Sequence, residues 1–167
     1  SAMNTAVGDA YFTLFSQDEG NAAALIQAQR LGAEKVALAL LDALPHSPHF
    51  GVQDDPSTAV VGVFDPVAFL EKIKHRVVTV HASDRYLLPG ASLDDLRSHD
   101  GTIGYPDQMK HGETGTGSND YDAIFRILRS VHFAGWISVE DGMDGLDELR
   151  RSVEFLKQKR AQYYGAA

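Results

Sequence analysis

Short apolar runs alternate with amphipathic segments along the chain from about residue 50 onward. Val77–Val80 is β-branched throughout and predicts a buried strand, and Phe50–Gln53 and Trp136–Val139 are further short runs of this kind. Each run is followed by a segment whose apolar residues recur at helical spacing. Continuous apolar strands separated by helices are typical of a parallel sheet covered by helices. The sequence therefore predicts an α/β fold with about three clear strand–helix units.

Three amphipathic helices are expected within these units. The first begins at Asp65-Pro66, because Asp caps the first backbone amides and Pro is tolerated at the first helical position. The second begins at Asn119 or Asp120, and the third forms the end of the chain. The expected apolar stripes are Val67, Leu70 and Ile73; Ile124, Ile127, Leu128 and Val131; and Leu146, Leu149, Val153 and Leu156.

The first fifty residues are less regular. Asn21–Leu31 has the spacing of a helix that stops at Gly32, but Lys35-Val36 then runs into Ala37–Leu41 with no turn residue between them. Two interpretations stay open for residues 35–38: a segment is missing there relative to a regular αβ repeat, or the stretch is one continuous or kinked helix. Residues 1–3 are interpreted as a tag remnant and the start Met, and residues 4–167 as a single domain.

The stretch from Asp84 to Ser118 lacks periodicity and holds six glycines and two prolines. No regular element is predicted there. A structureless stretch of this length in a compact domain is typical of a functional or mobile segment.

Composition narrows the function. The 167 residues carry a formal net charge of -8 and contain no cysteine. The lack of cysteine excludes a disulfide framework, a thiolate zinc site and a cysteine nucleophile. The negative net charge disfavours a nucleic-acid partner. No apolar stretch is long enough to cross a membrane, and no signal peptide is evident. We therefore expect a cytoplasmic protein with neither nucleic-acid nor membrane partners.

Three side chains follow the three predicted strands. Asp55, His81 and Glu140 come after Phe50–Gln53, Val77–Val80 and Trp136–Val139, respectively. Parallel α/β folds place their sites at the carboxyl ends of strands, so these residues can converge on one divalent metal. Simpler roles stay open for each: a helix cap for Asp55, a structural hydrogen bond for His81 and a polar strand end for Glu140.

Four segments resemble a known family, the sugar phosphate isomerase/epimerase group with a xylose isomerase-like TIM barrel. The segments are Phe50–Ser57, Val80–Arg85, Gly115–Tyr121 and Gly135–Gly142, and the resemblance covers about residues 38–157. It implies a (β/α) barrel of which mainly the C-terminal half is present, because full barrels have eight units in about 250 residues.

The resemblance also implies a mechanism. Asp55, His81 and Glu140 would be metal ligands, with Mn²⁺ expected and Mg²⁺, Co²⁺ or Zn²⁺ as alternatives. The metal would stabilise an enediolate of a sugar-like substrate, and Glu140 would also act as catalytic acid/base. Arg85 is the candidate to bind substrate oxygen or phosphate, with a surface salt bridge as its alternative. His111 is a second candidate substrate contact within a lid, with a solvated loop position as its alternative.

Two departures from the family pattern bear on function. The stretch that should carry a further Glu ligand, from a middle strand, is absent and would fall near Lys35–Ala37. Thr58 stands where the family often has His. The leading hypothesis is a divalent-metal-dependent isomerase or epimerase of a sugar, sugar phosphate or related polyol. The alternative is a non-catalytic or truncated barrel fragment that acts through self-association, and a homo-oligomer is expected in either case. A DNA-repair endonuclease on the same superfold is disfavoured by the acidic charge and by too few zinc ligands.

Overall fold

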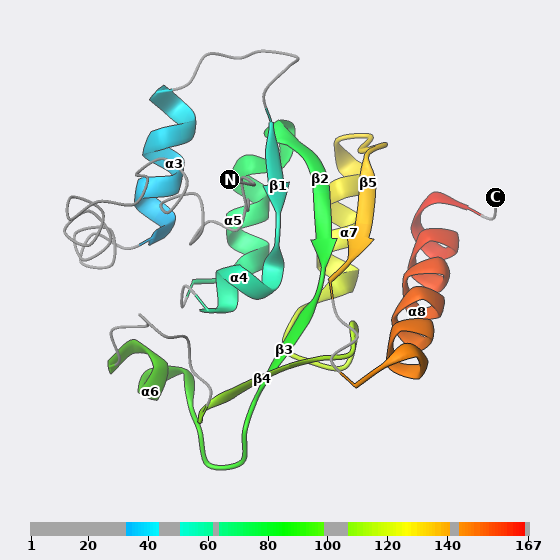
Figure 1. Ribbon diagram of the computed structural model, residues 1–167. Coiled ribbons are helices and arrows are strands. Elements are labelled where there is room, and N and C mark those ends of the chain that lie inside the picture. Colours follow the sequence, from blue (N-terminus) through cyan, green and yellow to red (C-terminus); the bar gives the residue numbers. More distant parts are fainter. Residues whose placement is uncertain (1–32, 44–50, 62–63, 99–106, 141–143, 166–167) are drawn as a thin grey trace, which may run out of the picture.

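Three parallel strands form the central sheet. The computed structural model describes residues 33–43, 51–61, 64–98, 107–140 and 144–165. Strands β1 (Val52–Asp54) and β5 (Trp136–Val139) lie on either side of β2 (Val77–Ala82), and both run parallel to it (Figure 1). The α/β class and the predicted incomplete barrel are thereby confirmed.

Strand β2 is longer than its apolar run. Its ladder with β5 continues through the pairs His81↔Ser138 and Ala82↔Val139. His81 therefore lies inside the strand rather than after it, because backbone pairing does not require an apolar side chain. Strand β1 begins at Val52, and Phe50 lies outside the described residues.

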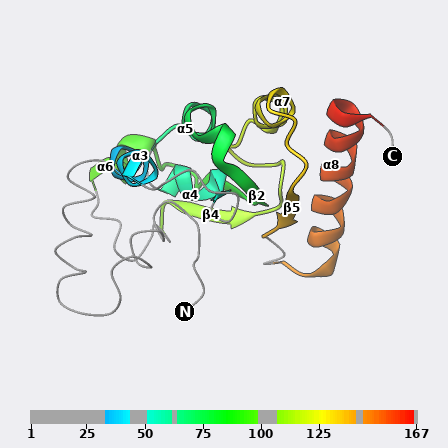
Figure 2. The same ribbon diagram turned by 90° about the horizontal axis from the view of Figure 1, so that it is seen from above.

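Helices cover one face of the sheet. Helices α5 (Pro66–Ile73) and α7 (Tyr121–Ser130) lie side by side on it, and α8 (Leu146–Tyr164) stands beside β5 (Figures 1 and 2). No described helix crosses the opposite face, which is turned to the viewer in Figure 1. The short helix α4 (Pro56–Val61) follows β1, and the 3-10 turn η1 (Lys74–Arg76) joins α5 to β2.

The predicted helix starts are confirmed by their caps. The Asp65 carboxylate accepts hydrogen bonds from the backbone N–H groups of Val67 at 2.8 Å and Ala68 at 3.0 Å. Asp120 likewise accepts from Ala123 N at 2.9 Å at the start of α7. Such caps satisfy amides that have no partner within the helix.

The core lies between the sheet and helices α5 and α7. Its members are fully shielded aliphatic and aromatic side chains, namely Phe69, Leu70, Ile73, Val80, Ala82, Tyr121, Ile124, Phe125 and Leu128. Phe125 is not part of the apolar stripe predicted for α7. The buried face of this helix is therefore wider than the predicted stripe.

Helix α8 is present as predicted, but its expected stripe is not its buried face. Leu146 is 69% exposed, whereas Glu148 and Ser152 are buried. Val153 and Leu156 line an open cavity of about 650 Å³ between α8 and β5. The helix therefore turns part of its apolar stripe toward the edge of the sheet, where no described strand pairs with the outer side of β5.

The stretch expected to be irregular contains regular elements, so that expectation was wrong. Strands β3 (Asp84–Leu87) and β4 (Met109–Gly112) form an antiparallel pair, and helix α6 (Leu93–Ser98) lies between them in sequence. Strands of four residues carry little periodicity. Their pairing depends on hydrogen bonds between segments more than twenty residues apart.

Residues 35–38 lie within one continuous helix, α3 (Ala33–Ala43), the second of the two local interpretations. That a segment is missing there relative to a regular repeat stays a prediction. The predicted helix Asn21–Leu31 lies outside the described residues. None of the described helices has the length and apolar character needed to cross a bilayer.

Truncating a core leucine should weaken the fold far more than truncating an exposed one. Leu128 is 0% exposed beneath the sheet, so Leu128→Ala should lower the free energy of unfolding by about 2–5 kcal/mol. The matched control Leu146→Ala should change it by less than about 0.5 kcal/mol. Urea titration followed by circular dichroism measures both, and equal effects would contradict the placement of the core.

Candidate metal centre

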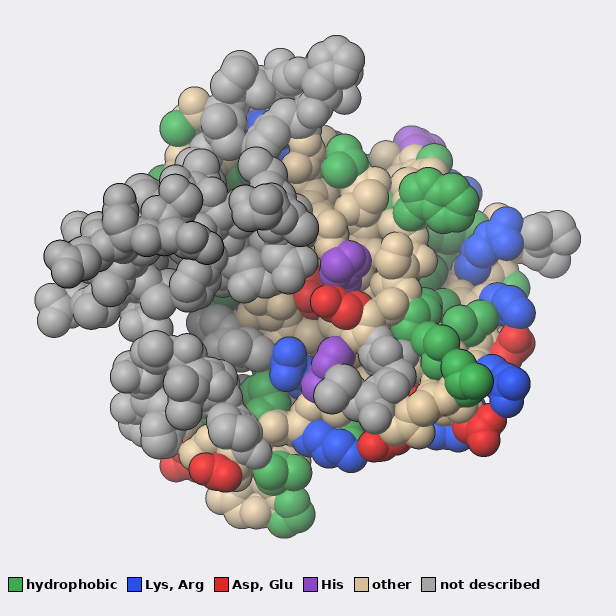
Figure 3. Space-filling view, in the orientation of Figure 1, with side chains coloured by type: hydrophobic (Ala, Val, Ile, Leu, Met, Phe, Trp, Pro, Cys, Tyr) green, Lys and Arg blue, Asp and Glu red, His purple; other side chains and the backbone are tan. Residues whose placement is uncertain are grey.

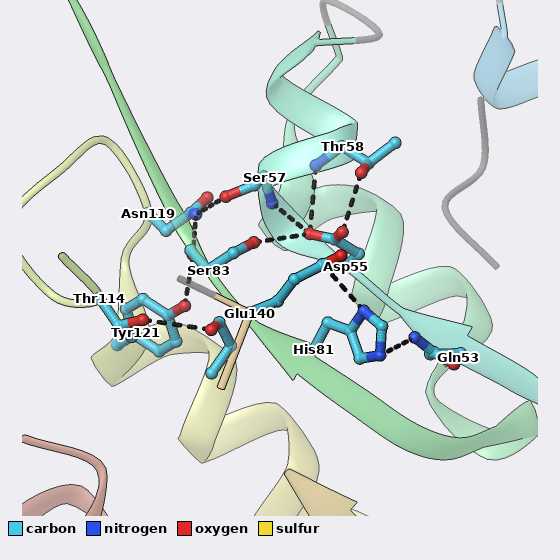
Figure 4. A network of polar contacts seen from close by, with 11 residues as sticks. Gln53, Asp55, Ser57, Thr58, His81, Ser83, Thr114, Asn119, Tyr121 and Glu140 are labelled. Atoms are coloured by element: carbon cyan, nitrogen blue, oxygen red, sulfur yellow. Dashed lines mark hydrogen bonds and ion pairs between the residues drawn. The ribbon is translucent and has the colours of Figure 1, made fainter. Parts of the chain in front are cut away.

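Asp55, His81 and Glu140 converge at the carboxyl end of the parallel sheet. Each offers one ligand atom, and these atoms all lie within 4.8 Å of one another. Asp55 lies between β1 and α4, His81 lies in β2, and Glu140 directly follows β5 (Figure 4). The three strands are neighbours in one sheet, so parallel pairing alone brings the three side chains together.

His81 is held between Gln53 and Glu140. Its Nδ1 lies 2.9 Å from Glu140 Oε2, and its Nε2 is hydrogen-bonded to the side-chain amide of Gln53. The imidazole is therefore fixed with Nδ1 turned toward the carboxylates. The His81 and Glu140 side chains are 25% and 45% exposed, so a solute can reach them.

Asp55 also caps helix α4, which is the simpler role that the sequence left open. Its Oδ1 accepts hydrogen bonds from Ser57 N at 3.0 Å, Thr58 N at 3.3 Å and Ser83 Oγ at 3.0 Å. Its Oδ2 accepts one, from Thr58 Oγ1 at 2.9 Å. A carboxylate oxygen has two lone pairs, so Oδ2 retains room for a cation. The two roles are compatible.

A buried carboxylate, Asp84, holds together the backbone segments next to the candidate metal centre. It is 0% exposed, and its Oδ2 accepts hydrogen bonds from Gly115 N and Gly117 N, both at 3.0 Å. Its Oδ1 accepts from Arg85 N at 2.9 Å and Asn119 N at 3.2 Å. Burial raises the pKa of Asp84, while these four N–H donors favour its ionised form and limit the rise. The contacts fasten residues 115–119 to the junction between β2 and β3.

The same junction is fixed at Ser83, whose hydroxyl contacts Asp55. Its carbonyl oxygen accepts hydrogen bonds from Tyr121 OH at 2.6 Å and Asn119 Nδ2 at 3.1 Å. Thr114 Oγ1 donates to the carbonyl oxygen of the preceding residue, Ala82, at 3.1 Å (Figure 4). The backbone that carries His81 is thus held by side chains from the 114–121 segment.

Sequence reasoning assigned no role to Gln53 or Asp84, and it considered Asn119 only as a possible start of the second helix. Gln53 had a detectable signal, since it stands two residues before Asp55 and strand alternation puts both on one face. Asp84 and Asn119 lie inside the segments that carry the family resemblance. Their structural role, holding the segment near residue 119 to the β2–β3 junction, becomes visible only from the hydrogen bond between them.

Asp54 is a second buried carboxyl group, on the other face of the sheet. It is paired with Val80, which belongs to the core beneath the helices. Burial first, and the charge of Asp55 second, raise the pKa of Asp54 to about 7. Asp54 therefore differs from Asp55 in its surroundings, although the two are adjacent in sequence.

Arg85 and His111 lie on the hairpin beyond the three ligand candidates. They are directly opposite each other in strands β3 and β4, and both are partly buried. His111 is thus in a strand rather than in the glycine-rich loop that was expected. Arg85 forms no ion pair with any residue in the described ranges, so its salt-bridge alternative is not realised there. Neither residue is hydrogen-bonded to Asp55, His81 or Glu140.

Fold and site together define an α/β barrel protein, incomplete in its described strands, with a candidate metal centre at the strand ends. A sequence model of the family "Xylose isomerase-like TIM barrel" matches residues 30–159, and the chain belongs to this family. This agrees with the resemblance found in the sequence.

A solved structure supports the same fold. The xylose isomerase domain protein from Planctomyces limnophilus matches with a TM-score of 0.64 and 15% sequence identity. The match covers 91% of this chain and 59% of that one, so this chain spans well under two thirds of the other protein. No curated protein matches.

Neutralising Asp84 should destabilise the fold, because at least two buried N–H groups would lose their acceptor. We expect Asp84→Asn to lower the free energy of unfolding by about 3 kcal/mol or more at neutral pH. The matched control is Asp120→Asn, since Asn caps a helix about as well as Asp and should cost little. Thermal and urea denaturation provide the measurement, and an Asp84→Asn protein as stable as the control would refute the supporting role of Asp84.

Proposed function

We propose that this protein is a divalent-metal-dependent isomerase or epimerase of a sugar, sugar phosphate or related polyol. The observation that carries the proposal is the convergence of Asp55, His81 and Glu140 within 4.8 Å. Membership of the xylose isomerase-like family supports the reaction class. The activity requires proton transfer at a carbon next to a carbonyl group, which proceeds through an enediolate.

The donor set fits a divalent cation. Two carboxylates and one imidazole suit Mn²⁺, our first choice, as well as Mg²⁺, Co²⁺ or Zn²⁺. A bound cation would supply Lewis-acid stabilisation of the negative charge that develops on the substrate oxygens. Three protein ligands leave coordination positions for substrate or water, which is typical of a catalytic site rather than a structural one.

Glu140 is the catalytic residue that we propose for proton transfer. Its Oε2 lies 2.9 Å from His81 Nδ1, so these two atoms would face a shared cation, and Oε1 would be the oxygen left to accept a proton from the substrate. Its exposure permits a small molecule to approach, and a carboxylate is a competent general base when it is positioned against the reacting carbon.

Gln53 is a positioning residue in this proposal. If His81 binds a cation through Nδ1, its Nε2 must carry the proton. Gln53 must then accept the hydrogen bond from this N–H with Oε1, which requires a rotation of its side-chain amide by half a turn. Hydrogen bonds of this kind set the tautomer of a ligand histidine and raise its affinity for metal.

Removing the base should stop turnover without harming the fold. We expect Glu140→Gln to lower the rate of solvent deuterium incorporation into sugars by about 10²-fold or more, because the amide cannot accept the proton. Proton NMR of Mn²⁺-loaded protein with aldoses, ketoses and their phosphates in D₂O measures the exchange, after removal of excess Mn²⁺. Glu154→Gln, on the exposed side of α8, is the matched control. An unchanged rate of deuterium incorporation in Glu140→Gln would contradict the assignment of Glu140 as the catalytic base.

Metal binding should depend on His81 and on Gln53, the residue that positions it. We expect about one Mn²⁺ per chain after loading and exhaustive desalting, lost in His81→Ala and retained in His75→Ala, a control at an exposed position. Gln53→Leu should weaken Mn²⁺ binding by about 10–100-fold, whereas Gln158→Leu on α8 should not. Native mass spectrometry gives the stoichiometry and calorimetry the affinity. Wild-type protein that retains no metal would contradict the proposal.

Self-association is a second candidate function, favoured by a specific surface. Trp136 is 81% exposed on β5 and borders the open cavity beside α8, and β2 is the only described strand that pairs with β5. We propose that a second copy of this chain binds there. An unpaired strand edge offers backbone donors and acceptors, and a two-fold axis would pair it with its own copy.

The oligomeric state tests this second candidate. Light scattering after size exclusion should show a dimer or larger species for the wild type and a shift toward monomer for Trp136→Ser. Leu146→Ser is the control, since Leu146 is also an exposed large apolar residue but does not line the cavity. A wild-type protein that is monomeric at all accessible concentrations would rule the candidate out.

A further inference from the structure

Arg85 and His111 form a second polar pair, on the hairpin that extends from the catalytic end of the sheet. They are Cα partners in the antiparallel ladder of β3 and β4. Residues directly opposite each other in such a ladder project from the same face of the hairpin. The guanidinium and the imidazole therefore lie together.

The side of the chain that carries Arg85 is also the side that carries the candidate metal centre. Ser83 donates a hydrogen bond to Asp55, which places the Ser83 side chain at the centre. Asp84 turns away to accept its four backbone N–H groups. In extended chain every second side chain shares a side, so Arg85 projects on the side of Ser83, about 7 Å farther along.

The space-filling view agrees with this placement. Figure 3 shows cationic and His side chains on the same face as the central Asp/Glu and His side chains, close below them. Cationic and imidazole side chains are therefore exposed on the face that also exposes the acidic ones.

Both members of the pair have an unused nitrogen. Arg85 Nε and His111 Nε2 are shielded from solvent, and neither has a hydrogen-bond partner in the described part of the chain. Arg85 is partly buried and has no ion pair with the described residues, so its guanidinium loses part of its hydration without gaining a counter-charge there. An anion bound from solution would supply that charge, whereas a neutral hydroxyl group would not.

We propose that Arg85 and His111 form an oxyanion subsite, and that the substrate is therefore an acidic sugar. This inference rests on the proposed isomerase or epimerase function. The subsite binds the end of the substrate remote from the reacting carbons, through the planar fork of the guanidinium and the imidazole N–H. A phosphate and a carboxylate share this chemistry, since both offer paired anionic oxygens.

Lys110 provides an internal control. It is the neighbour of His111 in β4, so alternation turns it to the other face of the hairpin, where its Nζ lies 3.1 Å from Asp144 Oδ2. A Lys110 variant removes one positive charge from the same strand but leaves the proposed subsite intact.

Calorimetric binding of matched sugars tests the proposal. The probes are D-ribose 5-phosphate against D-ribose, for a phosphate, and D-glucuronate against D-glucose, for a carboxylate. We expect at least one charged member to bind about tenfold or more tightly than its neutral parent, and Arg85→Met to abolish that preference. Arg85→Lys should retain part of it, His111→Gln should reduce it, and Lys110→Met should leave it unchanged. The pair that shows the preference identifies the anionic group.

Several outcomes overturn the subsite. It is wrong if neither charged sugar binds more tightly than its neutral parent, or if the preference survives in Arg85→Met with an unchanged melting temperature. Should Arg85→Met fail to fold, Arg85→Lys and His111→Gln decide in the same way.

Failure of this inference is distinguishable from failure of the proposed function. Metal content and deuterium exchange are measured on the same samples. A protein that holds Mn²⁺ and exchanges neutral sugars without charge preference contradicts the subsite alone. A protein that binds the charged sugar through Arg85 but shows neither metal nor exchange contradicts the proposed function alone.

Discussion

Hydrogen bonds to the buried carboxylate of Asp84 hold together the end of the sheet that carries the candidate metal centre. Four backbone N–H groups converge on it, from Arg85 on one side and from residues 115–119 on the other. The segment that it holds in turn fixes the Ser83 carbonyl through Asn119 and Tyr121. The backbone between His81 and Arg85 is therefore rigid, although it links two different sheets. Such rigidity is what a preorganised site requires.

The candidate metal centre needs only a small part of a barrel. Its three residues come from β1, β2 and β5, which are direct neighbours, so the donors meet without any further strand. A chain that spans 59% of a structurally similar protein can therefore still bring these three side chains together. The outer side of β5 has no partner strand among the described residues, and this open edge is the surface for which self-association is proposed. Catalysis and association would thus occupy different parts of one sheet.

The proposed substrate class follows from the continuity of the chain beyond the metal centre. Because β2 leads directly into β3, the side of the strand that carries His81 continues to Arg85, and the pairing with β4 adds His111. A substrate bound at the centre would extend along this side, away from the reacting carbons. In this proposal, the continuous β2–β3 strand carries both the residue that faces the reacting end of the substrate, His81, and the residue that binds its anionic end, Arg85.

The sequence by itself determined the elements with strong local signals. Apolar runs predicted β1, β2 and β5, capping residues predicted the starts of α5 and α7, and strand-end positions selected Asp55, His81 and Glu140. Only the tertiary structure decided the pairing of β3 with β4, the buried face of α8, and the roles of Gln53 and Asp84. The physical reason is range: a helix cap or an apolar stripe is encoded within a few residues. The buried carboxylate of Asp84, by contrast, binds three of its four amides more than thirty positions away, and nothing in its own neighbourhood specifies these three.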